Sequence, residues 1–147
     1  GWVMVRSRFL TAEHLIRSME VGDFYASSGV SLESVDRNAK QLKLTIQHEP
    51  GVHYTTFFVG TRKGFERAHE PFRAGDGNPV RNTHQYHESV GEVLAQTNDL
   101  SPTYVFQGDE IYVRAKVVSS KAMANPYRDG ETEWAWVPPL FGRGYAD

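Results

Sequence analysis

The residues best suited to chemistry in this sequence lie between positions 69 and 88. His84 and His87 stand three residues apart, Glu88 follows them, and His69 lies upstream in the same polar stretch. Imidazole and carboxylate groups are common ligands of divalent metal ions. One hypothesis is therefore a small metal-dependent enzyme whose metal site is formed by His69, His84, His87 and Glu88. The zincin pattern H-E-x-x-H, which would support a metal site, is absent. The same residues also fit a solvated loop that contains histidines by chance.

A second set of residues could bind a ligand without catalysis. Two tryptophans stand two residues apart and would share one face of a strand, where rigid aromatic rings can form a platform for a carbohydrate. Arginines between positions 60 and 89 could contact an anionic ligand. The candidate ligand-binding residues are Trp134, Trp136, Tyr127, Arg62 and Arg81. The tryptophans also fit a buried position, and the arginines, interleaved with acidic residues, also fit a solvated surface.

Composition argues against several other classes of function. The chain has no cysteine, which excludes a disulfide scaffold, a thiolate zinc site and a cysteine nucleophile. The chain has 16 lysine and arginine residues and 18 aspartate and glutamate residues. The resulting net charge of −2 argues against nucleic acid as a partner. No apolar run approaches the roughly 18–20 residues of a membrane span, so no membrane partner is expected. A cysteine-free chain fits both cytoplasm and export, which leaves the compartment open.

The elements that must position these residues are mostly short strands. Residues 41–49 and 111–118 alternate between apolar and polar side chains, as half-buried strands do. The turn at Pro50–Gly51 predicts that the first of these strands forms a hairpin with residues 52–59. One amphipathic helix is expected between an N-cap at Thr11 and a stop at Gly22. The predicted fold is mainly β, an antiparallel β-sandwich of about six to seven strands with one short N-terminal α-helix.

Changes in pattern along the chain suggest three parts. Residues 1–35 read as a strand–helix segment, residues 36–141 as the β-sandwich, and residues 142–147 as a flexible tail. Within the sandwich, residues 60–89 combine glycines, prolines and charges without a sustained period. They predict a long irregular loop, and long excursions often carry function.

Two segments of this chain are similar to the end of one known family. After the first strand, the chain follows a pattern L-T-x-E-x-L-I and then D-F-Y-A-S, which is carried here by Leu10, Thr11, Glu13, Leu15, Ile16 and residues 22–30. Later, residues 112–115, Asn125–Pro126 and Ala135–Trp136 fit the same relatives. Together these segments, about half of the chain, resemble the C-terminal part of PHP (polymerase and histidinol phosphatase) superfamily phosphoesterases, in which a barrel is followed by a β-domain.

The resemblance implies a role without catalysis. The family's metal ligands lie in H-x-H and D-x-H motifs, and neither motif occurs here. The chain would then hold the last barrel strand and helix plus the appended β-domain, with no catalytic residue and no cofactor of its own. A divalent metal would belong to the barrel of the parent protein, and that barrel would be the partner of this domain. The expected function is to support the barrel, with the loop 60–89 shaping substrate access.

Two further expectations accompany this one. The apolar first strand should either dock onto the sandwich or pair with another copy of the chain, since an open strand edge invites pairing. The alternative functions are a carbohydrate- or ligand-binding β-sandwich module and, after it, the small metal-binding enzyme based on the loop histidines.

Overall fold

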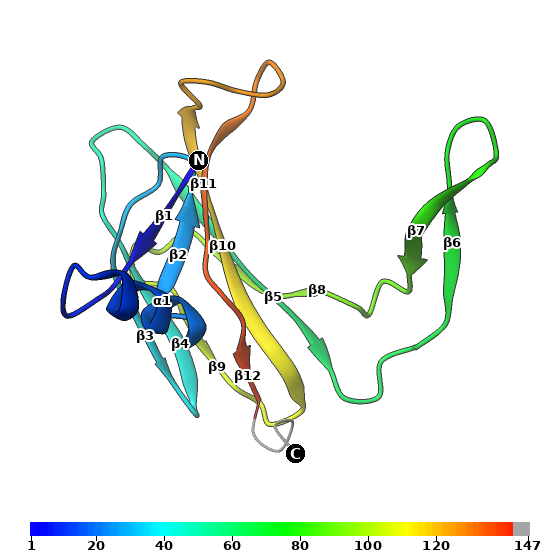
Figure 1. The fold of residues 1–147 in the computed structure, drawn as a ribbon, viewed down its shortest axis with the longest axis horizontal. Coiled ribbons are helices and arrows are strands. Elements are labelled where there is room, and N and C mark those ends of the chain that lie inside the picture. Colours follow the sequence, from blue (N-terminus) through cyan, green and yellow to red (C-terminus); the bar gives the residue numbers. More distant parts are fainter. Residues whose placement is uncertain (143–147) are drawn as a thin grey trace.

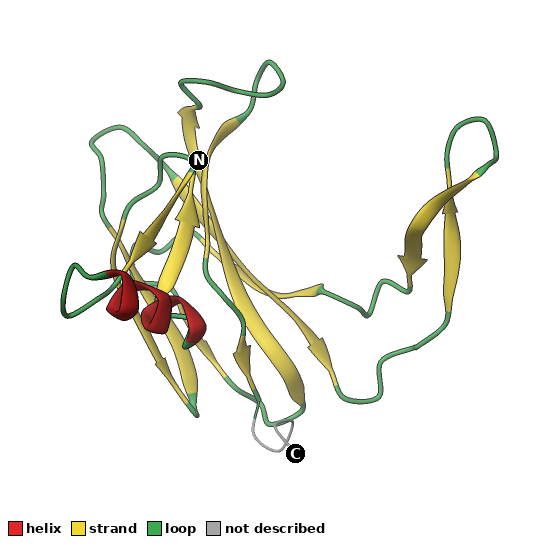
Figure 2. Cartoon of the chain, viewed as in Figure 1, coloured by secondary structure: helices red, strands yellow, loops and turns green. Residues whose placement is uncertain are grey.

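Two antiparallel sheets form the body of the molecule, and a separate hairpin extends from it (Figure 1, Figure 2). The computed structural model describes residues 1–142, except for the side chains of Pro79, Arg81 and Asn82. The predicted tail 142–147 therefore lies outside the described residues apart from Gly142, whose amide donates to the carbonyl of Ile111. No helix in the described part of the chain is long and apolar enough to cross a membrane.

The larger sheet contains seven strands. Their order is β1 (Trp2–Val5), β2 (Phe24–Ser27), β11 (Thr132–Trp136), β10 (Glu110–Ala122), β5 (Tyr54–Arg62) and β8 (Glu92–Thr97), and β12 (Leu140–Phe141) also pairs with β10. The smaller sheet has the order β3 (Leu32–Asn38), β4 (Gln41–Ile46) and β9 (Thr103–Val105). The remaining strands, β6 (His69–Arg73) and β7 (Pro79–Tyr86), pair only with each other.

The hydrophobic core lies between the seven-stranded sheet and the three-stranded sheet. Alternate residues of β4 point into it from the small sheet, and alternate residues of β5 and β10 point into it from the large sheet. This arrangement satisfies the period of two in each strand, because only one face of each sheet is buried. The buried apolar residues of this core are Tyr25, Val30, Leu42, Leu44, Ile46, Tyr54, Phe58, Tyr104, Val113, Ala115, Val117, Ala135 and Val137.

The predicted fold class is confirmed: the protein is mainly β and antiparallel, with one short helix. Residues 1–142 contain twelve strands rather than six or seven. Part of the difference comes from β9 and β12, which have three and two residues and are too short to show a period. The helix α1 spans Ala12–Glu20, and the hydroxyl of Thr11 accepts a hydrogen bond from the His14 amide, as the sequence predicted.

The predicted hairpin across Pro50–Gly51 was wrong. The strands β4 and β5 lie in different sheets and form no pair with each other. Both turn an apolar face inward, so the chain between them crosses from one sheet to the other and lets those faces pack together. The alternation in the sequence identified both strands correctly, but alternation does not specify which strands are neighbours.

The prediction of an irregular loop at 60–89 was also wrong. The strand β5 continues to Arg62, and β6 and β7 form a hairpin that we call the arm (residues 69–86). Every residue of β6 is exposed. A strand with no buried face has no reason to alternate in hydrophobicity, so the sequence contained no period to detect.

The first strand docks onto the body of the protein. β1 pairs with β2 in an antiparallel ladder from Trp2 opposite Ser27 to Val5 opposite Phe24, and it forms one edge of the large sheet. This is the first of the two outcomes expected for this strand. Residues 1–35 thus contribute β1, β2 and part of β3 to the same two sheets that the rest of the chain builds.

Candidate functional site

The N-terminal part of the chain exposes several large apolar side chains within twenty residues. Leu10 is 92% exposed and Ile16 is 58% exposed, and the helix α1 has no buried residue. We call this surface the N-terminal face. It comprises the exposed apolar residues of positions 2–21, which are Trp2, Val3, Met4, Phe9, Leu10, Ile16, Met19 and Val21. On β1, Val3 points to the opposite side of the sheet from Trp2 and Met4, while all three are exposed. Contiguous apolar surface marks an interaction site more often than scattered single residues do.

The helix explains why this surface exists. Ile16 and Met19 are three residues apart on α1 and therefore lie on one side of the helix. A helix of nine residues is too short to be stable by itself in water, and its apolar side normally packs against another element. Here α1 packs against β1, with Leu15 half-buried, while Ile16 and Met19 stay exposed.

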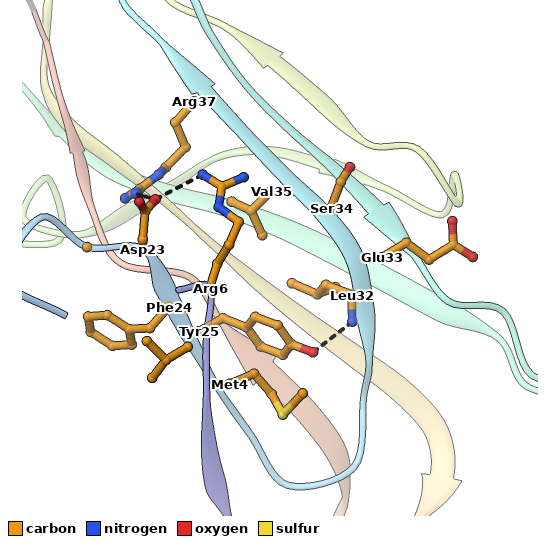
Figure 3. A pocket seen from close by; sticks show the side chains of 12 residues that line it. Met4, Arg6, Asp23, Phe24, Tyr25, Leu32, Glu33, Ser34, Val35 and Arg37 are labelled. Atoms are coloured by element: carbon orange, nitrogen blue, oxygen red, sulfur yellow. Dashed lines mark hydrogen bonds and ion pairs between the residues drawn. The ribbon is translucent and has the colours of Figure 1, made fainter. Parts of the chain in front are cut away.

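A pocket of about 240 Å³ opens beside this face, between the β1–β2 edge of the large sheet and strand β3 (Figure 3). Met4 and Tyr25 line it from one sheet, and Leu32 and Val35 line it from the other. The hydroxyl of Tyr25 accepts a hydrogen bond from the Leu32 amide at 3.1 Å. The pocket is the open end of the sandwich, where, within the described part of the chain, neither sheet has a further strand to close the core.

A charged cluster forms the rim of this pocket. One carboxylate oxygen of Asp23 accepts hydrogen bonds from the guanidinium groups of Arg6 and Arg37, each at 2.9 Å (Figure 3). Arg6 is largely exposed, whereas Arg37 is mostly buried. Two cations share one anion here, and Glu33 is the second acidic residue that lines the pocket.

The helix carries both acidic and basic residues, Glu13, Glu20 and Arg17. A neighbouring hollow is lined by Arg6, Arg8, His14 and Arg17, and Asp23 is its acidic residue. Within residues 1–142, neither Arg8 nor Arg17 forms an ion pair. The N-terminal face is thus an apolar surface whose border carries Arg8 and Arg17 together with Glu13 and Glu20 of α1. The two arginines would suit carboxylates on a partner surface.

The tryptophans predicted as a ligand platform lie on the outer face of the large sheet. Trp134 and Trp136 are half-buried and share that face, while Ala135 between them points into the core. The ring of Trp136 already has two cations near it, with the Arg114 guanidinium 4.5 Å and the Lys116 ammonium 5.2 Å from the ring centroid. Tyr127 is highly exposed in the loop between β10 and β11.

Arg62 lies at the far end of β5, in a polar network. It forms an ion pair with Asp109 and approaches Glu92 and the buried Glu110 at 3.6 and 3.7 Å. Arg62 therefore belongs to a partly exposed polar network at the end of β5. Its partner in the strand register is Glu110, whereas Arg114 and Lys116, the cations near Trp136, lie further along β10. The side chain of Arg81, the other predicted arginine, lies outside the described residues.

Glu110 is the centre of that network. Its carboxylate accepts hydrogen bonds from the Tyr104 hydroxyl at 2.6 Å and from the amides of Gln107 and Gly108 at 2.9 and 3.0 Å. Burial alone would raise the pKa of Glu110, but these hydrogen bonds outweigh burial and hold its pKa below the ordinary value. Burial and the bond to Glu110 raise the pKa of Tyr104 to about 12. Both pKa shifts arise in this network of hydrogen bonds, which joins β9 to β10.

The four predicted metal ligands are only partly brought together. The rings of His69 and His84 are in contact, with centroids 4.6 Å apart. His87 lies beyond the end of β7, where its Nδ1 and the Ser89 hydroxyl share a hydrogen bond of 2.9 Å. Among the described residues, no group of three or more histidine, aspartate or glutamate side chains is placed to hold a metal ion.

Sequence reasoning missed the residues at the N-terminal pocket. Arg6, Asp23 and Arg37 are separated by 17 and 14 residues, and they meet because β1, β2 and β3 converge at the open end of the sandwich. The sequence indicated this region only through the expectation that the apolar first strand would dock onto the sandwich or pair with another copy. Comparison with family models, with curated proteins and with solved structures found no match to this chain.

Proposed function

We propose that this chain is a non-catalytic β-sandwich domain of a PHP-like metal-dependent hydrolase, and that it supports the barrel of that protein by packing on it through the N-terminal face. The observation that carries the proposal is the set of eight exposed apolar side chains between positions 2 and 21. The resemblance of the opening segment to the end of a PHP barrel supports the identity of the partner, because the same residues would be the ones in contact with the rest of the barrel.

The charges around this face support a specific mode of contact. Apolar side chains such as Leu10 and Ile16 would supply most of the favourable free energy, at about 25 cal/mol for each Å² of apolar surface removed from water. Arg8 and Arg17 at the border would select a barrel surface that presents carboxylates opposite them. The divalent metal and the reaction would belong to the barrel.

Residues 60–89 have no part in substrate access in this proposal, because of where the arm lies. Figure 1 shows the arm at the opposite end of the molecule's long axis from β1 and α1. A barrel that packs on the N-terminal face would lie far from the arm of the same chain. The arm is therefore poorly placed to cover the mouth of that barrel.

A charge introduced into the N-terminal face tests the docking. In the parent protein, we expect Ile16→Glu to release this domain from the barrel, because the new carboxylate would be buried without a partner. Limited proteolysis should then cut the connection to the barrel at least ten times faster than in the unaltered protein. Val93→Glu is the matched control, since Val93 is 56% exposed against 58% for Ile16 but lies on β8 at the other edge of the sheet. Equal cleavage of the two variants would contradict the docking mode.

The identity of the partner is tested separately. The coding sequence upstream of Gly1 should encode a barrel with H-x-H and D-x-H motifs. An upstream sequence without these motifs would reject the PHP assignment, even if the N-terminal face proved to be a docking surface for some other domain.

A further inference from the structure

Two histidines of the arm face each other across the two strands. His84 of β7 lies opposite Pro71, and His69 of β6 lies opposite Tyr86. His69 and His84 are therefore diagonal neighbours on one face of the hairpin. Their ring centroids are 4.6 Å apart, with an angle of 84° between the ring planes. The register of the hairpin thus brings together two imidazoles that are fifteen positions apart in the chain.

These two imidazoles are available to a ligand. Both residues are exposed, and within the described residues neither ring forms a hydrogen bond or an ion pair. Two other histidines differ in this respect: the Nδ1 atom of His14 is hydrogen-bonded to Thr11, and that of His87 to Ser89. Among the described residues, His48 and His53 are also exposed without a ring hydrogen bond, but their rings are not in contact with each other. The pair on the arm combines contact, exposure and unused ring nitrogens.

The spacing of the rings suits one metal ion. With a metal–nitrogen distance of about 2.0–2.1 Å and a nitrogen–metal–nitrogen angle of about 90–109°, two imidazoles bound to one ion would have ring centroids roughly 4.5–5 Å apart. The observed 4.6 Å lies in this range, so a rotation of the two rings can point a nitrogen of each at a shared ion without moving the strands. Tyr86, whose ring lies 5.5 Å from that of His69, limits the space on one side of the pair.

We propose that His69 and His84 form a two-histidine site for a divalent transition-metal ion of the zinc, nickel and copper class. Neutral imidazole is a preferred ligand of these ions, whereas magnesium and calcium prefer oxygen ligands. Solvent water completes the coordination, because the chain supplies two ligands. His87 and Glu88 take no part. The site does not depend on the docking of the N-terminal face.

Metal binding has a structural consequence in the arm. An isolated two-stranded hairpin is only marginally stable in water, and the arm extends away from the sandwich (Figure 1). A metal ion held by one ligand from each strand would link β6 to β7 and favour the ordered hairpin, since binding to the folded form shifts the equilibrium towards it. The bound ion should therefore slow hydrogen exchange of the backbone amides in β6 and β7.

The test is calorimetric titration of the purified chain with zinc chloride in a buffer free of chelators. We expect one saturable site, with affinity at least ten times weaker in His69→Gln and in His84→Gln. His87→Gln is the matched control and should bind zinc as the unaltered chain does. Calcium chloride should give no saturable binding.

Three results would overturn the proposal. The first is no saturable zinc binding by the unaltered chain. The second is unchanged binding in His84→Gln, which would place the ion elsewhere. The third is an equal loss in His87→Gln, which would show that the site includes the wider histidine group. Hydrogen exchange provides the second readout: zinc should protect the amides of β6 and β7 in the unaltered chain and leave them unchanged in His84→Gln.

Discussion

Replacing Glu110 with alanine should lower the free energy of unfolding by about 3–5 kcal/mol, the range found when one partner of a buried charged network is removed. Glu110 is 1% exposed, and its carboxylate binds the Tyr104 hydroxyl and two backbone amides. In the alanine variant the buried Tyr104 hydroxyl and the two backbone amides lose their shared acceptor. Urea denaturation followed by tryptophan fluorescence measures the change.

Tyr104→Phe is the control for this prediction. It removes one of the hydrogen bonds to Glu110 and leaves the amides of Gln107 and Gly108 in place. The expected loss is about 1.5–3 kcal/mol, the usual contribution of a single hydrogen bond to a charged group. A loss in Glu110→Ala no larger than that in Tyr104→Phe would contradict the central role of the carboxylate.

The same network predicts how stability depends on pH. The pKa of Glu110 is lower in the folded protein than its ordinary value, so its contribution is fully present above that ordinary value and is lost as the pH falls through the folded pKa. The pKa of Tyr104 is raised to about 12, so its contribution is present below pH 10 and is lost as the pH rises through about 12. Unfolding in urea at several pH values should show a smaller acid-dependent loss in Glu110→Ala than in the unaltered chain.

Replacing Phe58 with alanine should also cost about 3–5 kcal/mol of unfolding free energy, the usual range for a large aromatic residue in a core. Phe58 is 1% exposed and points from β5 into the space between the sheets, where its ring lies 5.4 Å from that of Tyr104. The alanine variant would leave a cavity at the contact between the two sheets. Thermal and urea denaturation both measure this loss.

The neighbouring phenylalanine provides a matched control. Phe57 is the same residue type on the same strand, but it is half-buried on the outer face, opposite Lys116 of β10. Phe57→Ala should therefore cost clearly less than Phe58→Ala. Equal losses at the two positions would mean that the outer face of the large sheet is as tightly packed as the core, contrary to the arrangement described above.

The parts of the fold that the sequence predicted well are those with one buried face. In β4 the residues Leu42, Leu44 and Ile46 are buried and alternate with partly exposed residues, and β10 repeats the pattern over a longer stretch. Such strands carry their burial pattern in the sequence. The helix was equally predictable, because Thr11 provides a local capping interaction that needs no knowledge of the rest of the fold.

The sequence could not predict how distant segments meet. The arm has no buried face in β6, so neither its strands nor the contact of His69 with His84 could be inferred before the register was known. The cluster of Arg6, Asp23 and Arg37 depends on three strands converging at the open end of the sandwich. Alternation predicts strands, but it does not determine their partners, and both sites depend on those partners.

The most direct test of the docking proposal is hydroxyl-radical labelling of the methionines in the parent protein and in the isolated chain. Met4 and Met19 lie on the N-terminal face and are each about half exposed, whereas Met123 lies between β10 and β11 and serves as the internal reference. We expect Met4 and Met19 to be labelled in the isolated chain and protected in the parent protein, with Met123 labelled equally in both. Equal labelling of Met4 and Met19 in the two samples would contradict the proposal that a barrel covers this face.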